Sequence, residues 1–83
     1  MTLDYQEGAE QTIRAFLAAQ LGQPNIAADE QLFARGFVNS LLAMQLIAML
    51  EKSFSIQIED EDLDIANFSS IASMVSLIER KKA

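Results

Sequence analysis

Apolar residues recur with the period of an α-helix in separate segments of this chain, and this periodicity constrains its fold most. In residues 4–21 they form one stripe, with polar residues on the other side: Ala9, Ile13, Phe16, Leu17 and Leu21. A stripe of the same kind follows Ser69 and Ser70, either of which can cap a helix: Ile71, Met74, Val75 and Ile78. We therefore expect a long first helix that ends at Gly22 and a shorter last helix.

Residues 40–53 predict a second long helix, because they are mostly strong helix formers. Its core stripe consists of Leu42, Leu46, Met49 and Leu50. Further apolar residues lie off this stripe: Leu41, Ala43, Met44, Ile47 and Ala48. A helix that is apolar nearly all round is either fully buried or presents an exposed contact face, and the sequence leaves both possibilities open.

Only residues 54–58 alternate like a β-strand, and we see no partner strand for them, so we expect an extended linker. The connection 22–39 should be pinned to the core by apolar residues, namely Ile26, Leu32, Phe33, Phe37 and Val38. Within it, Asp29 could cap one helical turn over residues 30–33. The 83 residues thus predict a single domain, 1–83: an all-α bundle of three to four helices with a long loop between the first two.

Charge and missing residue types exclude several function classes. Six basic against twelve acidic residues give a net charge of −6, which disfavours nucleic acids and anionic membranes as partners. The chain has no Cys and no His, so thiolate catalysis and Ser-His-Asp chemistry are absent. No apolar run is long enough to span a membrane, and Met1–Asp4 lacks the basic region of a signal peptide. We expect a cytoplasmic, monomeric protein without catalytic residues of its own.

An acidic run occupies residues 59–64. Its simplest interpretation is a solvated helical turn, and the alternative is an acidic edge that docks onto a basic enzyme surface. The spacing of Asp60, Asp62 and Asp64 is like that of a calcium loop, but the glycine and the closing glutamate are missing. We therefore expect no metal site.

Ser40 is the residue with the clearest chemical potential, because it opens the second helix just after a glycine-containing connection. One interpretation is that Ser40 or Asn39 simply caps the helix. The other is that Ser40 carries a phosphate ester, whose charge the free N–H groups of a helix start favour. Without a resident base, Ser40 would be modified by another enzyme and would not act as a nucleophile itself.

The order and spacing of these elements resemble the acyl carrier and peptidyl carrier protein family over nearly the whole chain. The resemblance includes Leu32-Phe33 and Gly36 in the loop, Ser40-Leu41 at the helix start, and Glu51 and Phe54 at its end. It implies that a phosphopantetheinyl transferase, with coenzyme A and Mg²⁺, attaches 4′-phosphopantetheine covalently to Ser40. The thiol of this group would carry an acyl or aminoacyl group as a thioester.

The resemblance also implies partners: the transferase, an acyl- or aminoacyl-loading enzyme, and a downstream synthase or acyltransferase. The positions that would contact these partners are Asn39, Leu41, Met44, Gln45, Ala48 and, near the arm, Phe68. The core of such a carrier would contain Phe16, Leu46, Leu50 and Ile71.

Two departures from the family pattern bear on the cargo. Asn39 stands where the family usually has Asp, and the second helix lacks the acidic outer face of fatty-acid carriers. The segment 39–46 is similar to stand-alone carriers of secondary metabolism that hold glyceryl, hydroxymalonyl, methoxymalonyl or aminomalonyl units for polyketides. A discrete aminoacyl carrier of nonribosomal peptide synthesis is the close alternative. From another class, a small helical adaptor would use the apolar second helix to bind a partner, with Ser40 only a cap.

Overall fold

The computed structural model describes residues 2–23, 25–34, 36 and 38–82, with side chains from residue 8 onward. This part of the chain is helical and contains no strand, which confirms the expected all-α bundle. Its elements are α1 (Thr2–Leu21), α2 (Ser40–Phe54), the 3₁₀ turn η1 (Asp60–Asp62), α3 (Ile65–Phe68) and α4 (Ile71–Lys82).

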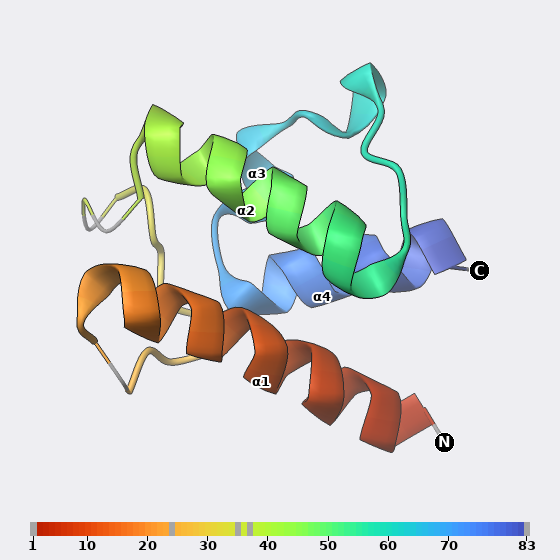
Figure 1. Cartoon of the computed structure of the whole chain (residues 1–83), viewed down its shortest axis with the longest axis horizontal. Coiled ribbons are helices and arrows are strands. Elements are labelled where there is room, and N and C mark those ends of the chain that lie inside the picture. The colour runs from red at the N-terminus through yellow and green to blue at the C-terminus, as the bar shows by residue number, and fades with distance from the viewer. Residues whose placement is uncertain (1, 24, 35, 37, 83) are drawn as a thin grey trace.

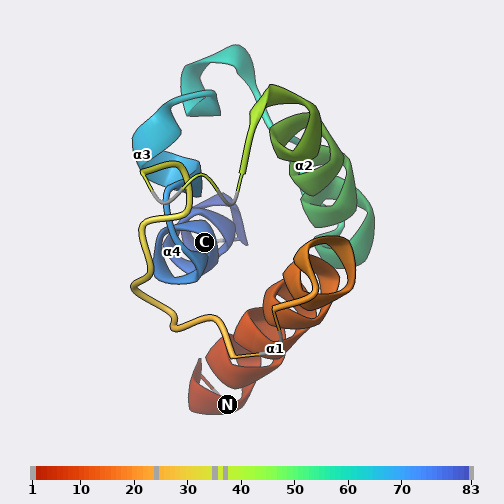
Figure 2. The same ribbon diagram turned by 90° about the vertical axis from the view of Figure 1, so that its left-hand side faces the viewer.

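Helix α4 is the element against which the others are organised (Figure 1). Both α1 and α3 pack against it, whereas α1 and α2 make few direct contacts. Figure 2 shows α1 and α2 on one side of the bundle, α3 and α4 on the other, and the long connection along the α3–α4 side. Two backbone hydrogen bonds fix this connection: Leu32 N–H to the Ser69 carbonyl at 2.8 Å, and Ala72 N–H to the Ala28 carbonyl at 2.9 Å.

The core is mostly aliphatic, and the predicted stripes supply most of it, together with Leu32 of the connection and Leu77 of α4. Its fully buried large side chains are Ile13, Leu17, Leu32, Leu46, Leu50, Ile71, Met74, Leu77 and Ile78. The expected core positions Leu46, Leu50 and Ile71 are therefore confirmed. The expected core residues Phe16 and Met49 are partly buried: they pack against this core and also line a groove between α1 and α2.

The expected helical turn over residues 30–33 is wrong. The chain makes two separate turns instead, closed by Glu30 N–H to the Ala27 carbonyl and by Gly36 N–H to the Phe33 carbonyl, each at 3.1 Å. The N–H of Leu32 is used by Ser69, so the backbone there serves the tertiary structure and not a local helix. Ile26, Leu32 and Val38 are buried as expected, and Phe33 is partly buried; Phe37 lies outside the described residues.

Residues 55–59 connect α2 to η1 without regular structure, in agreement with the expected linker. The turn η1 lies within the acidic run, as predicted. Ser70 caps α4, since its Oγ accepts a hydrogen bond of 3.1 Å from the N–H of Ser73. The four-residue helix α3 has no signal of its own in the sequence, because it spans only about one turn.

Candidate functional site

The start of α2 is capped by Asn39. Its Oδ1 accepts a hydrogen bond of 3.0 Å from the N–H of Leu42, and its backbone is extended, with φ −115° and ψ −176°. Its carbonyl accepts the N–H of Ala43 at 2.8 Å. Of the two caps that the sequence allowed, Asn39 is the one that forms, and Ser40 is the first residue of the helix proper.

The side chain of Ser40 is exposed, and its hydroxyl makes no hydrogen bond within the described part of the chain. The N–H groups of Ser40 and Leu41 lie in the first turn, where an α-helix offers them no backbone acceptor. These groups and the helix dipole give the surroundings of Ser40 a positive partial charge. An anion bonded to this hydroxyl would therefore meet a favourable field.

The loop before Ser40 is fastened at several points, which defines where the helix starts. Gly36 has φ +76°, a left-handed conformation that side chains other than glycine disfavour. Two residues later, Val38 is 4% exposed and donates its N–H to the carbonyl of the buried Leu32 at 3.3 Å. The connection is therefore anchored to the core one residue before the cap.

Beside Ser40, a cleft of about 280 Å³ separates α2 from the η1–α3 segment. We call it the α2–α3 cleft; it is lined by Phe33, Ser40, Ala43, Ile47, Leu63, Asp64, Ile65 and Phe68. Among the described residues that line it, only Asp64 is charged, and its Oδ1 accepts the N–H of Ala66 at 3.0 Å. Phe68, which we grouped with the partner contacts, is 5% exposed and faces this cleft, so it is not part of the outer surface.

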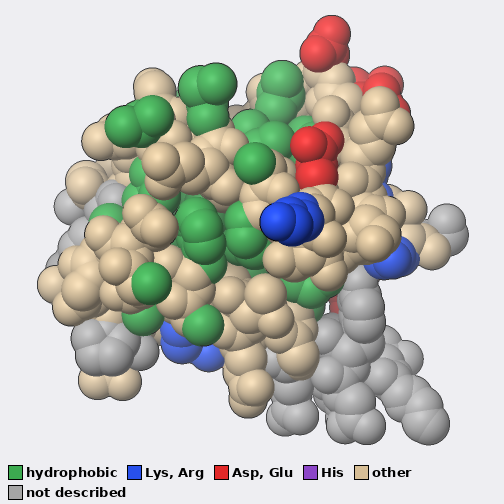
Figure 3. Space-filling model, in the orientation of Figure 1, with side chains coloured by type: hydrophobic (Ala, Val, Ile, Leu, Met, Phe, Trp, Pro, Cys, Tyr) green, Lys and Arg blue, Asp and Glu red, His purple; other side chains and the backbone are tan. Residues whose placement is uncertain are grey.

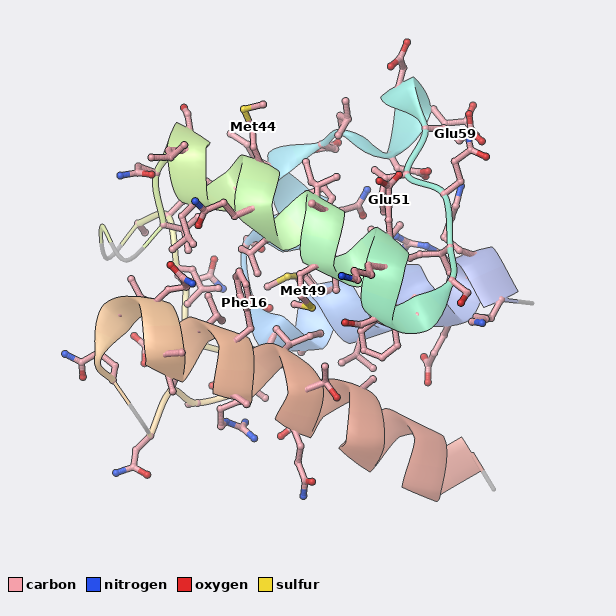
Figure 4. All side chains as sticks on the ribbon, in the orientation of Figure 1. Phe16, Met44, Met49, Glu51 and Glu59 are labelled. Carbon is pink, nitrogen blue, oxygen red and sulfur yellow. The ribbon has the colours of Figure 1, made fainter. Side chains whose placement is uncertain are left out.

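The outer face of α2 is apolar and exposed, which decides between the two interpretations of this helix. Leu41 and Met44 are 67% and 69% exposed, and Figure 4 shows Met44 pointing away from the bundle. In Figure 3, hydrophobic side chains gather over α2, and acidic side chains lie at the η1 end. An exposed apolar face of this kind is typical of a surface that contacts another molecule.

Two exposed apolar residues that line the cleft were not predicted from the sequence. Leu63 and Ile65 are 55% and 67% exposed, and they flank Asp64 on the wall opposite α2. Their only signal in the sequence is their position beside acids: Leu63 interrupts the acidic run, and Ile65 follows it.

The other predicted contact positions lie on the opposite flank of α2. Gln45 and Ala48 are exposed and line the groove between α1 and α2, which has a volume of about 450 Å³. Phe16 of α1 and Met49 of α2 line the same groove, and Figure 4 shows both side chains between the two helices. The structure thus separates Gln45 and Ala48 from the cleft at Ser40.

The acidic run is not uniformly solvated. Whereas Glu59, Asp60 and Glu61 are exposed, the Asp62 side chain is only 14% exposed and lies 2.7 Å from Lys81 Nζ. The Lys81 hydrogen bond, followed by that from the Glu59 N–H, lowers the pKa of the Asp62 carboxyl below its ordinary value. The same hydrogen bond raises the pKa of Lys81. This pairing is not evident in the sequence, because the partners are nineteen residues apart.

Neither a metal site nor a membrane span is found in the described residues. No three acidic, histidine or cysteine side chains among them come together as a metal site. None of the helices in this part of the chain is long and apolar enough to cross a bilayer.

Comparison with known families identifies the chain. The sequence model of the family described as the phosphopantetheine attachment site matches residues 11–78. This match covers most of the 83 residues, so the chain belongs to the phosphopantetheine attachment family of carrier domains. Such domains hold 4′-phosphopantetheine covalently and are generally non-catalytic carriers that work with transferases and with loading or synthase enzymes. Among curated proteins, none matches the chain.

The residues at the start of α2 fit this prosthetic group. An esterified hydroxyl must be accessible, and Ser40 is exposed. A phosphodiester is anionic, and the start of a fifteen-residue helix favours an anion. The rest of the arm is uncharged and partly aliphatic, which suits the mainly apolar walls of the α2–α3 cleft.

Proposed function

We propose that Ser40 is the attachment point of 4′-phosphopantetheine and that residues 1–83 form one carrier domain. The observation that carries this proposal is the exposed hydroxyl of Ser40 at the first position of α2, which makes no hydrogen bond to the described residues and lies inside the matched range 11–78. When attached, the group supplies a thiol that carries an acyl group as a thioester. This accounts for a carrier without a single Cys.

Several residues around Ser40 contribute to the attachment of the group in different ways. Asn39 caps the start of α2, so the cap does not use the Ser40 hydroxyl. Because the chain has no His, the proton of that hydroxyl is removed by a group of the transferase. Ala43 and Ile47 of α2 form apolar surface next to Ser40, along which the uncharged part of the arm can lie.

Partner enzymes are proposed to meet the carrier over the outer face of α2. Leu41 and Met44 are its exposed apolar residues nearest to Ser40 in sequence. No acid occupies the first turn of α2, whereas the exposed acids Glu59 to Glu61 lie at the η1 end. Apolar contact should therefore supply most of the binding, and charge should orient the partner mainly from the η1 side.

For the cargo we propose an acyl group, in particular an unusual polyketide extender unit, delivered to a synthase or acyltransferase. The support is the uncharged outer face of α2, which separates this chain from carriers with an acidic second helix. A discrete carrier of aminoacyl groups is the competing assignment. Incubating the phosphopantetheinylated chain with candidate loading enzymes, and weighing the product, distinguishes the two.

A direct experiment tests the attachment itself. The folded chain is incubated with a broad-specificity phosphopantetheinyl transferase and a fluorescent coenzyme A. We expect labelling of the parent and of Ser53→Ala, which removes an exposed serine at the other end of α2, but not of Ser40→Ala. Labelling of Ser40→Ala would refute the assignment.

The exposed apolar face also supports one candidate from another class, a small helical adaptor. In that case Leu41 and Met44 would bind a partner, and Ser40 would have no chemical role. Failure of several transferases to modify the folded chain would favour the adaptor over the carrier.

A further inference from the structure

The two walls of the α2–α3 cleft are held in different ways. One wall belongs to α2, whose residues Leu42, Leu46 and Leu50 are buried in the core. The other wall is the segment 59–68, which packs against α4 through α3. Between residues 59–68 and α2, no hydrogen bond joins described residues. The position of this second wall is therefore set from the α4 side.

Burial anchors only one end of this wall. Phe68, at the end of α3, is 5% exposed. At the other end, Leu63 and Ile65 are more than half exposed, so burial of apolar surface does little to hold them. A helix of four residues is also too short to persist without tertiary contacts.

Polar contacts to α4 hold this wall at two positions, Asp62 and Asn67. Lys81 Nζ donates to Asp62 Oδ2 at 2.7 Å, and Arg80 donates to Asn67 Oδ1 at 2.8 Å. The Nδ2 of Asn67 donates in turn to the Asp62 carbonyl at 2.9 Å. We call these four residues, Asp62, Asn67, Arg80 and Lys81, the latch.

The latch differs from an isolated surface ion pair. The side chains of Lys81 and Asp62 are 21% and 14% exposed, so water competes less for their contact than for a fully exposed pair. Asp62 Oδ2 also accepts the N–H of Glu59 at 2.9 Å, which fixes the carboxylate to its own turn. Each member of the latch is thus tied to another, and they act on the segment as a unit.

We propose that Asp62, Asn67, Arg80 and Lys81 are positioning residues that hold the η1–α3 wall opposite Ser40 for partner enzymes. The inference rests on the proposed function of Ser40. An enzyme that reaches Ser40 over the mouth of the cleft meets Leu41 and Met44 on one side and Leu63 and Ile65 on the other. Loss of the latch contacts allows Leu63 and Ile65 to move, whereas Leu41 and Met44 keep their positions on α2.

Hydrogen exchange of the unmodified chain tests whether the latch holds this wall. In Lys81→Gln, amides of residues 59–68 should exchange about two- to fivefold faster, the range expected for one such contact. Lys81→Arg keeps the charge and a donor and should restore slow exchange. Lys82→Gln removes the neighbouring, exposed charge and should change nothing in this segment. Unchanged exchange in Lys81→Gln, or faster exchange over the whole chain, would overturn a local role.

Kinetics of phosphopantetheine transfer test the link to Ser40. We expect Lys81→Gln to raise the KM for the carrier by about two- to fivefold, with kcat unchanged and Lys82→Gln like the parent. An unchanged KM, or a loss of kcat alone, would overturn the positioning role. Failure of Ser40 modification in every chain would refute the proposed function instead, and the exchange result would stand independently of it.

Discussion

Asn39 closes the first turn of α2 by accepting the N–H of Leu42 at 3.0 Å, and the adjacent Ser40 is exposed, with no hydrogen bond from its hydroxyl to a described residue. The cap and the candidate attachment residue are therefore different side chains. A cap that used the Ser40 hydroxyl itself would occupy the atom that must form the ester.

Two replacements of Asn39 distinguish the capping hydrogen bond from the effect of a charge at the start of α2. Asn39→Ala should lower the free energy of unfolding by about 1 kcal/mol, because the N–H of Leu42 loses its acceptor. Asn39→Asp keeps an acceptor and adds a negative charge at the positive end of α2, so it should be at least as stable as the parent. Urea denaturation measures both, and equal stability of all three chains would contradict the role of the cap.

Two leucines of α2 should respond in opposite ways to truncation. Leu46 is fully buried, so Leu46→Ala should cost about 2–5 kcal/mol through lost burial and a cavity. Leu41 is 67% exposed, so Leu41→Ala should change stability by less than about 0.5 kcal/mol. Denaturation followed by circular dichroism checks this contrast, and a large loss for Leu41→Ala would mean that its exposure is wrong.

A charge on the outer face of α2 should impair partner binding without unfolding the chain. Met44 is 69% exposed, so Met44→Asp should fold normally but lower kcat/KM for phosphopantetheine transfer by about tenfold, through lost apolar contact. Ser76→Asp adds the same charge at an exposed position of α4 and serves as the control. Equal kcat/KM values for Met44→Asp and Ser76→Asp would show that the outer face of α2 is not part of the docking surface.

The pKa shift at Asp62 predicts a stability effect that depends on pH. Because the folded chain holds the pKa of Asp62 below 3.8, its ionised form stabilises the fold above that value. Near neutral pH the parent should be more stable than Asp62→Asn, and the difference should shrink as pH falls below 3.8. Lys81, whose pKa is raised above 10.5, takes part in the same contact, so this stabilisation should be lost in alkali as well as in acid. Urea midpoints of both chains across pH measure the difference, and a constant gap into acid would contradict the shift.

Much of the fold was predictable because α1 and α4 obey local rules. Ile13 and Leu17 lie on the predicted stripe and are fully buried, and Gly22 ends α1 with φ +69°. Such features depend on helical period and backbone geometry, which neighbouring residues determine. The start of α2 at Asn39 and Ser40 follows from capping for the same reason.

What the sequence did not predict depends on residues far apart in the chain. The helical turn expected at residues 30–33 does not form, because the N–H of Leu32 donates to the carbonyl of Ser69. Asp62 is not fully solvated, because it forms an ion pair with Lys81 of α4. Phe16 lies on an apolar stripe yet is only partly buried, because it lines the groove between α1 and α2. Period and composition describe a helix face, but they do not say which neighbour covers it.

The most direct test of the central claim is the mass of the intact chain after incubation with a phosphopantetheinyl transferase, coenzyme A and Mg²⁺. Fragmentation then locates the added group. We predict a single phosphopantetheine adduct on Ser40 of the parent and none on a folded Ser40→Ala variant. An adduct on another residue, or no adduct on a folded parent with two different transferases, would contradict the assignment of Ser40.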